Sequence, residues 1–526
     1  MANSFQYNVK QGRRKNMKKL SRIIFGRTVI ILSLFAIQIA IMLALFLWMS
    51  EYINYIYGGF TLLSLLTIVY IINSPSNPNF KLAWIVPILV IPIFGTLFYI
   101  YAQMEFGTKM IVSSLKTIRA KTNHLLVQDE DALKEVAERD PDIARVAKYL
   151  MNTGKFPIYK NSTAKYFPIG EEAFEEMVKQ LKEAKHFIFM EYFIIESGIM
   201  LDTVVGILEQ KVREGVEVRF MYDGMVSLAQ MPNSYTDELE KMGINAKQFS
   251  PIKPILSTSY NNRDHRKIMV IDGRVAFTGG INLADEYINK KKRFGHWKDN
   301  AIMVKGDAVR SFTLMFLQMW NVDENIPEDY ERYLRMPHGN THCDGYMMPY
   351  GDDPFDYENV GENLYIDMIA NAKEYVHIMT PYLILDDSMV NAMSFAAKSG
   401  IDVVVMMPHI PDKWYAYALA RTYYEELIRA GVKIYEYTPG FVHSKVFVSD
   451  GMKATVGTVN LDYRSLYLHF ECGVYLYGSE AVKEVEWDFK ETLKRCHLIT
   501  LEEAANFGLL QKIIGRFVLR LFAPLL

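Results

Sequence analysis

The sequence predicts an α/β protein made of two copies of one domain, preceded by membrane-spanning helices. Three observations predict this fold class. A His-x-Lys-x4-Asp pattern occurs twice, beginning at His265 and at His443. Ahead of each copy, short runs of apolar, aromatic and β-branched residues, typical of buried strands, recur in the same order. Near the N-terminus, uncharged apolar runs reach about 20 residues, the length that crosses a bilayer core.

The N-terminal apolar runs cover residues 28–48, 53–72 and 82–101. They are too long and too many for a cleaved signal peptide. We therefore expect residues 28–103 to be a membrane region with two or three spans. The basic tail over residues 1–27 is expected in the cytoplasm, because Lys and Arg favour that side. The side on which the remainder lies stays open, since two and three spans place it on opposite sides.

Two long α/β units follow the apolar region. Residues 104–150 are predicted to be a polar, helical connector, and residues 151–335 the first unit. A polar linker at 336–354 leads to the second unit, residues 355–505. Repetition at this scale predicts duplicated domains, each with a mixed or largely parallel sheet covered by helices. The expected strands lie within 184–198 and 216–224, and again within 372–387 and 401–412, and the segments 243–251 and 431–439 follow them at matching places.

The last segment, residues 506–526, has a helical pattern. Lys512, Arg516 and Arg520 recur every four residues, so they lie on one helical face, with Leu, Ile, Val and Phe filling the remainder. This pattern favours a basic amphipathic helix in the headgroup region of an anionic membrane. A helix packed on its own domain is the alternative.

Composition argues against several kinds of partner. The net charge of −2 and a pI near 6.6 provide no bulk attraction to nucleic acid, and we expect no nucleic-acid partner. The three cysteines are far apart and form no C-x-x-C pair. The sequence therefore indicates neither a disulfide framework nor a metal site.

Each motif copy brings an imidazole and an ammonium together. In an extended chain His265 and Lys267 point to the same face, because the side-chain period is two. The segment "KIMVIDG" then reads as a strand that turns at Asp-Gly, a hairpin signal. Asn282 follows His265 by 17 residues (282 − 265), and Asn460 follows His443 by the same step (460 − 443). Each half therefore supplies an imidazole, an ammonium and an amide to one place.

Two such half-sites facing each other suit a phosphodiester. Lysine and asparagine can hold the anionic oxygens, one histidine can attack phosphorus, and the other can protonate the departing alkoxide. A single His-x-Lys match could arise by chance, and an isolated histidine is more often structural than catalytic. Two matches at equal spacing within duplicated units exclude that explanation.

These residues resemble the HKD motifs of the phospholipase D superfamily. The stretches "HRKIMVIDGRVAFTGGINLADEY", "FGHWKDN", "PYLILDD" and "RLFAPLL", with the N-terminal apolar runs, resemble bacterial cardiolipin synthases of that superfamily. The resemblance implies two α/β/α domains about a pseudo-two-fold axis, in a multi-pass protein of the bacterial cell membrane. It implies that two phosphatidylglycerol molecules become cardiolipin and glycerol through a phosphatidyl-histidine. Phosphatidylglycerol and anionic membrane lipids are the implied partners, with no cofactor or metal.

The resemblance also implies roles for individual residues. His265 is the expected nucleophile and His443 the general acid and base, although the near symmetry leaves the order open. The residues expected to hold the substrate phosphate are Lys267, Lys445, Asn282 and Asn460, with further contacts from Gly280 and Thr458.

Four acidic residues complete the expected site. Asp272 and Asp450 belong to the motifs but resemble positions that stabilise the turn without reaching the phosphate. One acid is expected to orient each histidine. Glu471 lies 28 residues after His443 (471 − 443), and Asp299 lies 34 after His265 (299 − 265), with Glu286 as the rival of Asp299. A surface salt bridge is the alternative for these acids.

Two other classes of function compete with the transferase. A hydrolase of the same superfamily, a phospholipase D or a nuclease, uses water as acceptor, and a membrane scaffold carries a dead duplicate. Intact His, Lys and Asn in both halves argue against the scaffold. A neutral pI argues against a nuclease, which needs a basic surface. The oligomeric state stays open.

Overall fold

The computed structural model forms two compact units. One comprises Met1–Gly107 with Ile252–Ser259, and the other, the catalytic unit, comprises Thr108–Pro251 with Tyr260–Leu526. The residues that the structure describes are 33, 35–41, 43–44, 53–103, 106–224, 231–232, 234–249, 261–324, 327–335, 344–506, 508 and 514–525. The predicted basic tail, 1–27, and most of the apolar run 28–48 lie outside the described residues.

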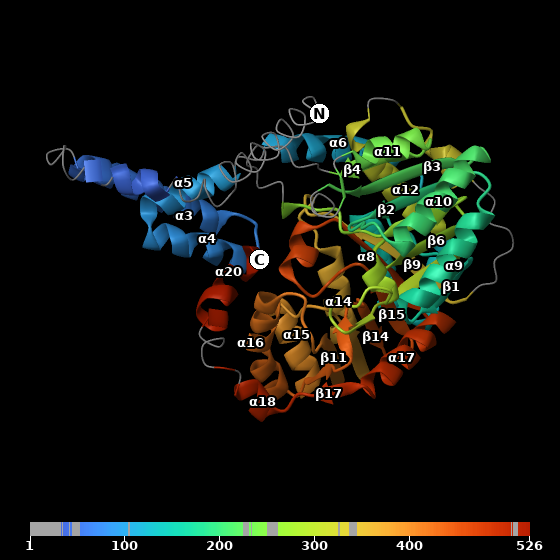
Figure 1. Cartoon of the computed structure of the whole chain (residues 1–526). Helices are drawn as coiled ribbons and strands as arrows, with labels where there is room; N and C mark the ends of the chain where they lie inside the picture. Colours follow the sequence, from blue (N-terminus) through green and yellow to red (C-terminus); the bar gives the residue numbers. More distant parts are fainter. Residues whose placement is uncertain are drawn as a thin grey trace, which may run out of the picture. The chain divides into compact units, whose positions relative to one another are not determined.

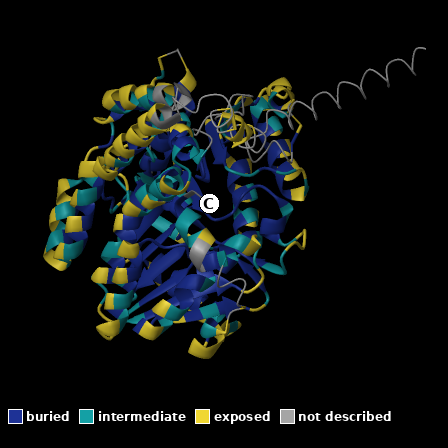
Figure 2. Cartoon of the chain, turned by 90° about the vertical axis from the view of Figure 1, so that its left-hand side faces the viewer, coloured by how far each residue is buried: buried dark blue, intermediate teal, exposed yellow. Residues whose placement is uncertain are grey.

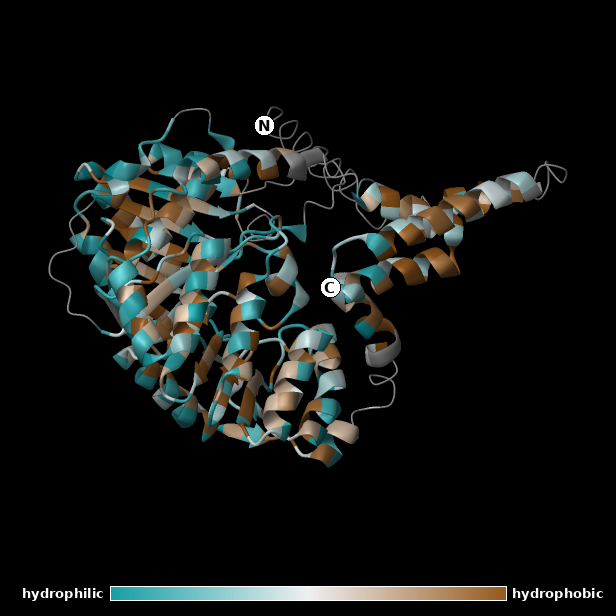
Figure 3. Ribbon diagram, turned by 180° about the vertical axis from the view of Figure 1, so that it is seen from behind, coloured by the Kyte–Doolittle hydropathy of each residue, from teal (hydrophilic) through white to brown (hydrophobic). Residues whose placement is uncertain are grey.

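Where the structure describes the N-terminal unit after residue 52, it forms the apolar helices α3 (Ile53–Asn73), α4 (Pro78–Val90) and α5 (Pro92–Gln103) (Figure 3). The predicted third span, 82–101, is divided between two of them. Pro92 starts α5 and cannot donate a backbone N–H, and it pushes Ile91 out of helical geometry, to φ −135° and ψ 78°. With 13 and 12 residues, α4 and α5 are about 20 Å long or less, against a bilayer core of about 30 Å.

The prediction of N-terminal transmembrane helices is therefore corrected. Among the residues that the structure describes, no helix combines the length and the apolar composition needed to cross a membrane. The expectation of two or three spans in residues 28–103 rested on the length of the apolar runs. For residues 82–101, the length of the run does not reveal that Pro92 divides it into two shorter helices.

The catalytic unit is built around two mixed sheets that share one topology (Figure 1). The strands of the first, in spatial order, are β1 (Ser162–Phe167), β8 (Ala301–Gly306), β6 (Val275–Gly279), β5 (Ile268–Ile271), β2 (Phe187–Tyr192), β3 (Glu217–Asp223) and β4 (Asn245–Phe249). Those of the second are β9 (Tyr346–Asp352), β16 (Glu471–Tyr477), β15 (Lys453–Gly457), β14 (Val446–Ser449), β10 (Tyr375–Met379), β11 (Asp402–Pro408), β12 (Lys433–Tyr437) and β17 (Cys496–Leu498).

The two sheets correspond strand for strand, apart from the extra edge strand β17. In each, three consecutive strands run parallel (β2–β3–β4 and β10–β11–β12) and the rest pair antiparallel. The four strands expected from sequence, β2, β3, β10 and β11, are all present within their predicted ranges, and the matched segments 243–251 and 431–439 contain β4 and β12. Residues 346–352, which fall in the stretch expected to be a linker, form β9 and pair with β16.

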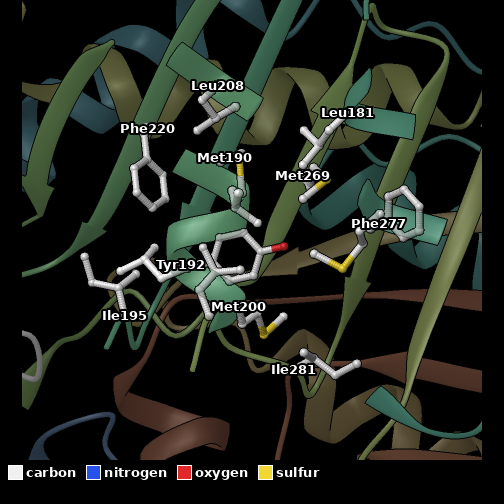
Figure 4. Close-up of a cluster of buried hydrophobic side chains, with 14 of the residues drawn as sticks. Leu181, Met190, Tyr192, Ile195, Met200, Leu208, Phe220, Met269, Phe277 and Ile281 are labelled. Carbon is white, nitrogen blue, oxygen red and sulfur yellow. The ribbon is translucent and has the colours of Figure 1, made fainter. Parts of the chain in front are cut away.

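Helices cover both sheets, and Figure 2 shows buried strands beneath helices with exposed outer faces. Side chains of β2 alternate between two layers, as the strand period requires. Met190 joins a cluster with Leu181 of α9 (Gly170–Glu183) and Leu208 of α10 (Ile199–Arg213) (Figure 4). On the other face Phe189 stacks on Phe316 of α12 (Val309–Trp320) at 4.8 Å. The helices of the first half are α9 (Gly170–Glu183), α10 (Ile199–Arg213), α11 (Tyr235–Lys241), α12 (Val309–Trp320) and α13 (Tyr330–Leu334), after the connector helices α6 (Phe106–Thr122), α7 (Glu130–Arg139) and α8 (Pro141–Thr153).

The second half repeats this layering. Tyr365 of α14 stacks on Phe447 of β14 at 3.9 Å, and Phe489 of α17 stacks on His377 of β10 at 4.5 Å. The helices of this half are α14 (Val360–Ala370), α15 (Asp387–Lys398), α16 (Trp414–Ala430), α17 (Glu480–Leu493) and α18 (Leu501–Ala505). A π-helical turn, η5 (Arg464–Leu468), follows β15, and a 3-10 turn, η3 (Asp285–Ile288), follows β6.

The halves are joined by shared structure. Strand β7 (His296–Lys298) of the first half pairs in parallel with β13 (Gly440–Val442) of the second. Asp488 of α17 accepts hydrogen bonds from the Tyr166 hydroxyl at 2.7 Å and from the Lys298 ammonium at 2.8 Å, both in the first half. In this region each half is therefore held in place by hydrogen bonds to the other half.

The C-terminal segment forms short helical turns, described from residue 514 onward: η6 (Gly515–Leu519), α20 (Arg520–Phe522) and η7 (Ala523–Leu525). Arg520 lies over the Tyr423 ring at 4.6 Å and donates to Glu426 at 3.3 Å, so it contacts α16 of the catalytic unit. Lys512 lies outside the described residues.

The motif aspartates form the two hairpin turns. Asp272 and Gly273 both have positive φ (53° and 61°), as a type I′ turn requires, and Asp450 and Gly451 repeat this at 55° and 63°. The Asp272 carboxylate accepts three backbone N–H groups, from Lys185, His186 and Phe187, at 2.7–2.9 Å. Each aspartate thereby fixes the start of the central strand beside its hairpin, as the equivalent contacts of Asp450 with residues 373–375 show.

We predict that Asp272→Ala lowers the free energy of unfolding by about 3 kcal/mol or more, because it removes charge-assisted hydrogen bonds and leaves backbone donors unsatisfied. Asp450→Ala should cost less, since Asp450 is half-buried and two of its three donors lie at exposed positions where water can replace it. Urea unfolding of the detergent-purified protein measures both. Equal losses, or none for Asp272→Ala, would contradict this role.

Candidate active site

The two His-x-Lys pairs lie just before equivalent strands. His265 and Lys267 precede β5, and His443 and Lys445 precede β14. Both histidines are buried, with 6% and 8% of their surface exposed. Arg266, between the first pair, points away and forms an ion pair with Glu191 at 2.6 Å, as the alternation of an extended chain predicts.

Each histidine is bound by an acid from the opposite half. The His265 Nδ1 lies 2.8 Å and 3.0 Å from the two carboxylate oxygens of Glu471. The His443 Nδ1 lies 2.7 Å from Asp299 Oδ2. Sequence spacing had associated each acid with the histidine of its own half. Glu286, the rival of Asp299, forms an ion pair with Arg293 at 3.0 Å instead.

The backbone explains this crossing. The His265 N–H donates to the Phe470 carbonyl at 3.0 Å, and the His443 N–H donates to the Lys298 carbonyl at 2.7 Å. Phe470 and Lys298 each immediately precede an orienting acid. The backbone of each histidine is therefore hydrogen-bonded to the residue just before the other half's carboxylate, and this register brings the two side chains into contact.

The two motif lysines are held in equivalent ways. The Lys267 ammonium donates to the carbonyl of His265 at 2.5 Å, and the Lys445 ammonium donates to the carbonyl of His443. Both side chains are almost fully buried. An ammonium has three N–H donors, so each lysine keeps donors for an anion after binding its own motif carbonyl.

The two asparagines differ in their contacts. The Asn282 side chain accepts from the Ile194 N–H at 2.9 Å and donates to the Tyr287 hydroxyl at 2.7 Å. The Asn460 Oδ1 is buried and, among the described residues, has no hydrogen-bond partner. The amide of Asn460 is the freer of the two to reorient toward a ligand.

Gly280 and Thr458 lie against the orienting acids. The Thr458 hydroxyl donates to Glu471 and accepts from the Cys472 N–H at 3.0 Å. A Cβ on Gly280 would lie 1.9 Å from the Asp299 carboxylate, so only glycine fits there. In this structure both residues position the carboxylates that hold the histidines.

Three aromatic neighbours were missed by sequence reasoning. The His469 ring lies 5.6 Å from that of His265, and among the described residues neither of its nitrogens has a hydrogen-bond partner. Phe193 makes an edge contact with His265 at 4.8 Å, and Tyr287 contacts His443 at 5.6 Å. The one local signal was the position of His469, two residues before Glu471 (471 − 469).

Burial and mutual repulsion shift the pKa values of the basic groups downward. Burial, with the charge of Lys267, lowers the pKa of His265 well below its ordinary value. Burial lowers the pKa of His443 to about 4, that of Lys267 to about 8 and that of Lys445 to about 7. The lysine of each half also lowers the pKa of the other half's histidine, so the four basic groups lie around one space.

The two orienting acids respond in opposite directions. Burial raises the pKa of Glu471 to about 8, against the opposing charge of Lys267. Burial also acts to raise the pKa of Asp299, but the charge and hydrogen bond of His443 outweigh it and lower that pKa. The pKa of one orienting acid is therefore raised and that of the other lowered, although the two carboxylates hold their histidines in equivalent ways. The pseudo-symmetric site is electrostatically asymmetric.

One group near the site has the spacing of metal ligands. A ligand atom from each of His265, His469 and Glu471 lies within 4.8 Å of the others, a donor set that zinc accepts. The buried ammonium groups of Lys267 and Lys445 oppose a divalent cation there, and Glu471 is already bound to His265. We assign no metal to this group.

Comparison with known proteins agrees with this geometry. Residues 177–320 and 365–493 match the family described as "Cardiolipin synthase, PLD-like domain", and residues 62–102 match "Phospholipase_D-nuclease N-terminal". A cardiolipin synthase of Alkalihalophilus pseudofirmus is 35% identical over 89% of this chain and 93% of its own length. A protein of Streptococcus mutans serotype c is 50% identical over 88% of this chain and 99% of its own length.

Among solved structures, phosphatidylserine synthase of Haemophilus influenzae Rd KW20 is similar to this chain with a TM-score of 0.55. The similarity covers 73% of this chain and 99% of that one, at 14% sequence identity. At this identity the likeness concerns the fold alone.

The crossed hydrogen bonds predict a crossed response to mutation. Glu471→Gln should shift the Nδ1 resonance of His265 and leave that of His443, while Asp299→Asn should do the reverse. Each change should lower turnover by about 10²–10⁴-fold, because the amide holds the wrong tautomer. Nitrogen-15 NMR of labelled histidine tests the assignment, with Glu286→Gln as matched control. Shifts in the histidine of the same half would overturn it.

The lowered lysine pKa values predict that anion binding weakens as pH rises. Lys445 and Lys267 are charged below their pKa values of about 7 and about 8 and lose their protons above them. The Kd for sulfate, which stays dianionic, should rise by about tenfold or more between about pH 6 and about pH 9. Calorimetric titration of the purified protein measures it. A constant Kd over this range would mean that these lysines do not bind the anion.

Proposed function

This chain belongs to the phospholipase D-like cardiolipin synthases, and we propose that its paired histidines perform the family's phosphatidyl transfer in two displacements. The chain is a phosphatidyltransferase that synthesises cardiolipin. The observation that supports this two-step mechanism is the pair of buried histidines beside two buried lysines. Each histidine is held by a carboxylate of the opposite half. A phosphodiester has two ester oxygens, and this arrangement offers one histidine to each side of phosphorus.

In the first displacement, His265 Nε2 attacks the phosphorus of a phosphatidylglycerol. Glu471 supports this step, because its two contacts with Nδ1 keep the ring proton there and leave the Nε2 lone pair free. The bond from phosphorus to the glycerol headgroup breaks, and His443 gives the departing oxygen a proton. Although burial lowers the pKa of His443 to about 4, the negative charge of a bound phosphodiester raises it and allows protonation.

In the second displacement, a headgroup hydroxyl of another phosphatidylglycerol attacks the phosphatidyl group on His265. His443 takes the hydroxyl proton, the phosphorus–nitrogen bond breaks, and its electron pair returns to His265. Cardiolipin leaves and the starting state is restored. Lys267 and Lys445 stabilise the charge on the phosphoryl oxygens in both steps, and Asn460 offers an amide to them.

Burial of the site favours a lipid acceptor over water. His265 and His443 are only 6% and 8% exposed, and Phe193 and Tyr287 pack against them. Excluding water protects the intermediate from hydrolysis to phosphatidic acid. An alcohol carried on a neighbouring lipid can enter from the lipid surface.

The chain is a membrane-associated bacterial protein, as its family and its N-terminal family match imply. Large apolar side chains on α3, such as Leu62, Leu65 and Tyr70, are more than half exposed, and patches of this kind mark lipid or protein contacts. We propose anionic lipids, phosphatidylglycerol among them, as the surface it binds. The C-terminal segment 506–526 is a second proposed contact with that surface.

The test is a product assay on phosphatidylglycerol vesicles. The purified protein should produce cardiolipin and glycerol in equal amounts, with or without a chelator, because lysines supply the positive charge at the phosphate. Excess glycerol should drive the reaction backwards, since donor and product are esters of the same kind. Mass spectrometry of lipids and an enzymatic assay for glycerol measure both products.

Controls separate the competing readings. His265→Ala and His443→Ala should each abolish turnover, with unfolding midpoints near that of the wild type. Phosphatidic acid as the main product would instead indicate a hydrolase, and no product would indicate a scaffold. Near wild-type turnover in either single variant would refute the shared site.

A further inference from the structure

A small cavity next to the catalytic centre carries charges that the two displacements do not use. Lys413, at the start of α16, and Arg464, at the start of η5, line it together with Asp462 and Tyr382. The Lys413 ammonium lies over the Tyr382 ring at 5.2 Å. Neither cation belongs to a His-x-Lys motif, and both come from the second half.

The chain connects this cavity directly to the site. Asp462 follows Asn460 by two residues (462 − 460), and the Asn460–Asp462 segment is fixed by the hydrogen bond from the Ile384 N–H to the Leu461 carbonyl at 2.8 Å. Ile384 itself lines the cavity. The cavity therefore begins where the second phosphate-binding segment ends.

Electrostatics connect the two places as well. Burial raises the pKa of Asp462, while the charges of Lys413, Arg464 and Lys445 oppose that rise. Burial lowers the pKa of His469, and Arg464, Lys267 and Lys413 lower it further. The outer cations and the motif lysines thus act on the same groups, although only the motif lysines contact the histidine carbonyls.

The reaction brings a second anion, the phosphate of the acceptor lipid, close to the phosphate that reacts. Cardiolipin carries two phosphodiesters joined through one glycerol, three carbons and two ester oxygens apart. When the acceptor hydroxyl attacks phosphorus, the acceptor's own phosphate must lie one glycerol length away. Two anions this close repel each other in a buried site unless cations face both of them. Lys267 and Lys445 face the phosphate of the donor lipid.

We infer that Lys413 and Arg464 bind the phosphate of the acceptor lipid and so select an anionic phospholipid as acceptor. This inference rests on the proposed function. Asp462 accepts the Ser465 N–H at 2.8 Å and leaves the cavity with a net positive charge, two cations against one carboxylate. Its remaining oxygen can accept a hydrogen bond from a hydroxyl of the bridging glycerol.

The walls of the cavity fit a lipid headgroup. Tyr415 and Ala523 add apolar surface beside the cations, and Ala523 belongs to the C-terminal segment. Trp414, next to Lys413, is 65% exposed. Tryptophan beside lysine is typical of the membrane interface, where the ring lies among headgroups and the ammonium meets phosphate.

The experiment compares three acceptors with one donor. Full-length protein in mixed micelles of detergent and phosphatidylglycerol receives radiolabelled glycerol, glycerol 3-phosphate, or no soluble acceptor. The products are labelled phosphatidylglycerol, phosphatidylglycerol phosphate and cardiolipin. As acceptors, glycerol carries neither a phosphate nor acyl chains, and its reaction uses only the donor site. Glycerol 3-phosphate carries a phosphate without acyl chains, and phosphatidylglycerol carries both.

Lys413→Ala and Arg464→Ala should each lower cardiolipin and phosphatidylglycerol phosphate formation by about tenfold or more, because each removes a charge-assisted contact. Exchange of glycerol should stay within about twofold of the wild type. Lys413→Arg should restore most of the lost rate. Lys398→Ala removes an exposed lysine of α15 as the matched control and should change none of the three.

Each other result overturns the inference. An equal fall in all three reactions assigns these residues to the donor site or to folding, and unchanged rates leave them without a role. If the two variants lose cardiolipin formation alone, the cavity binds acyl chains or the lipid surface and does not bind phosphate. If the wild type transfers to no acceptor, the proposed function fails first, and sulfate binding in the Lys413→Ala variant still tests whether the cavity holds an anion.

Discussion

The pairing of each histidine with a carboxylate from the opposite half is the interaction on which the catalytic unit depends. It joins His265 to Glu471 and His443 to Asp299, and the backbone bonds to Phe470 and Lys298 set its register. A half in isolation has a histidine without its acid and an acid without its histidine. Duplication therefore produced one site with two contributors, and neither half is catalytically complete.

Burial of this pairing determines the chemistry. Burial lowers the pKa values of all four basic side chains, and neighbouring basic groups lower those of His265, His443 and Lys445 further. The motif carbonyls and the two carboxylates compensate for part of that repulsion, and an entering phosphodiester compensates for the rest. In the proposed mechanism an anion both binds the lysines and restores the protonation that general acid catalysis needs.

Smaller residues keep this arrangement in place. Gly280 leaves room for Asp299, and Thr458 holds Glu471. Asp272 and Asp450 act at the far ends of the hairpins, where they fix the strands that lead to the histidines. Gly280 and Thr458 therefore lie beside the orienting acids, whereas the two aspartates act at a distance, through the strands.

The sequence by itself determined the features that depend on local pattern. The repeated His-x-Lys pairs, the Asp-Gly turns and four of the central strands follow from side-chain period and turn chemistry, and the structure contains them. Only the tertiary structure decided which acid meets which histidine, because spacing along the chain carries no information on pairing between halves. It also revealed His469, the cavity at Lys413, and the division of residues 82–101 into two helices. Each of these depends on contacts, or on a local break at proline, that apolar length and motif spacing do not encode.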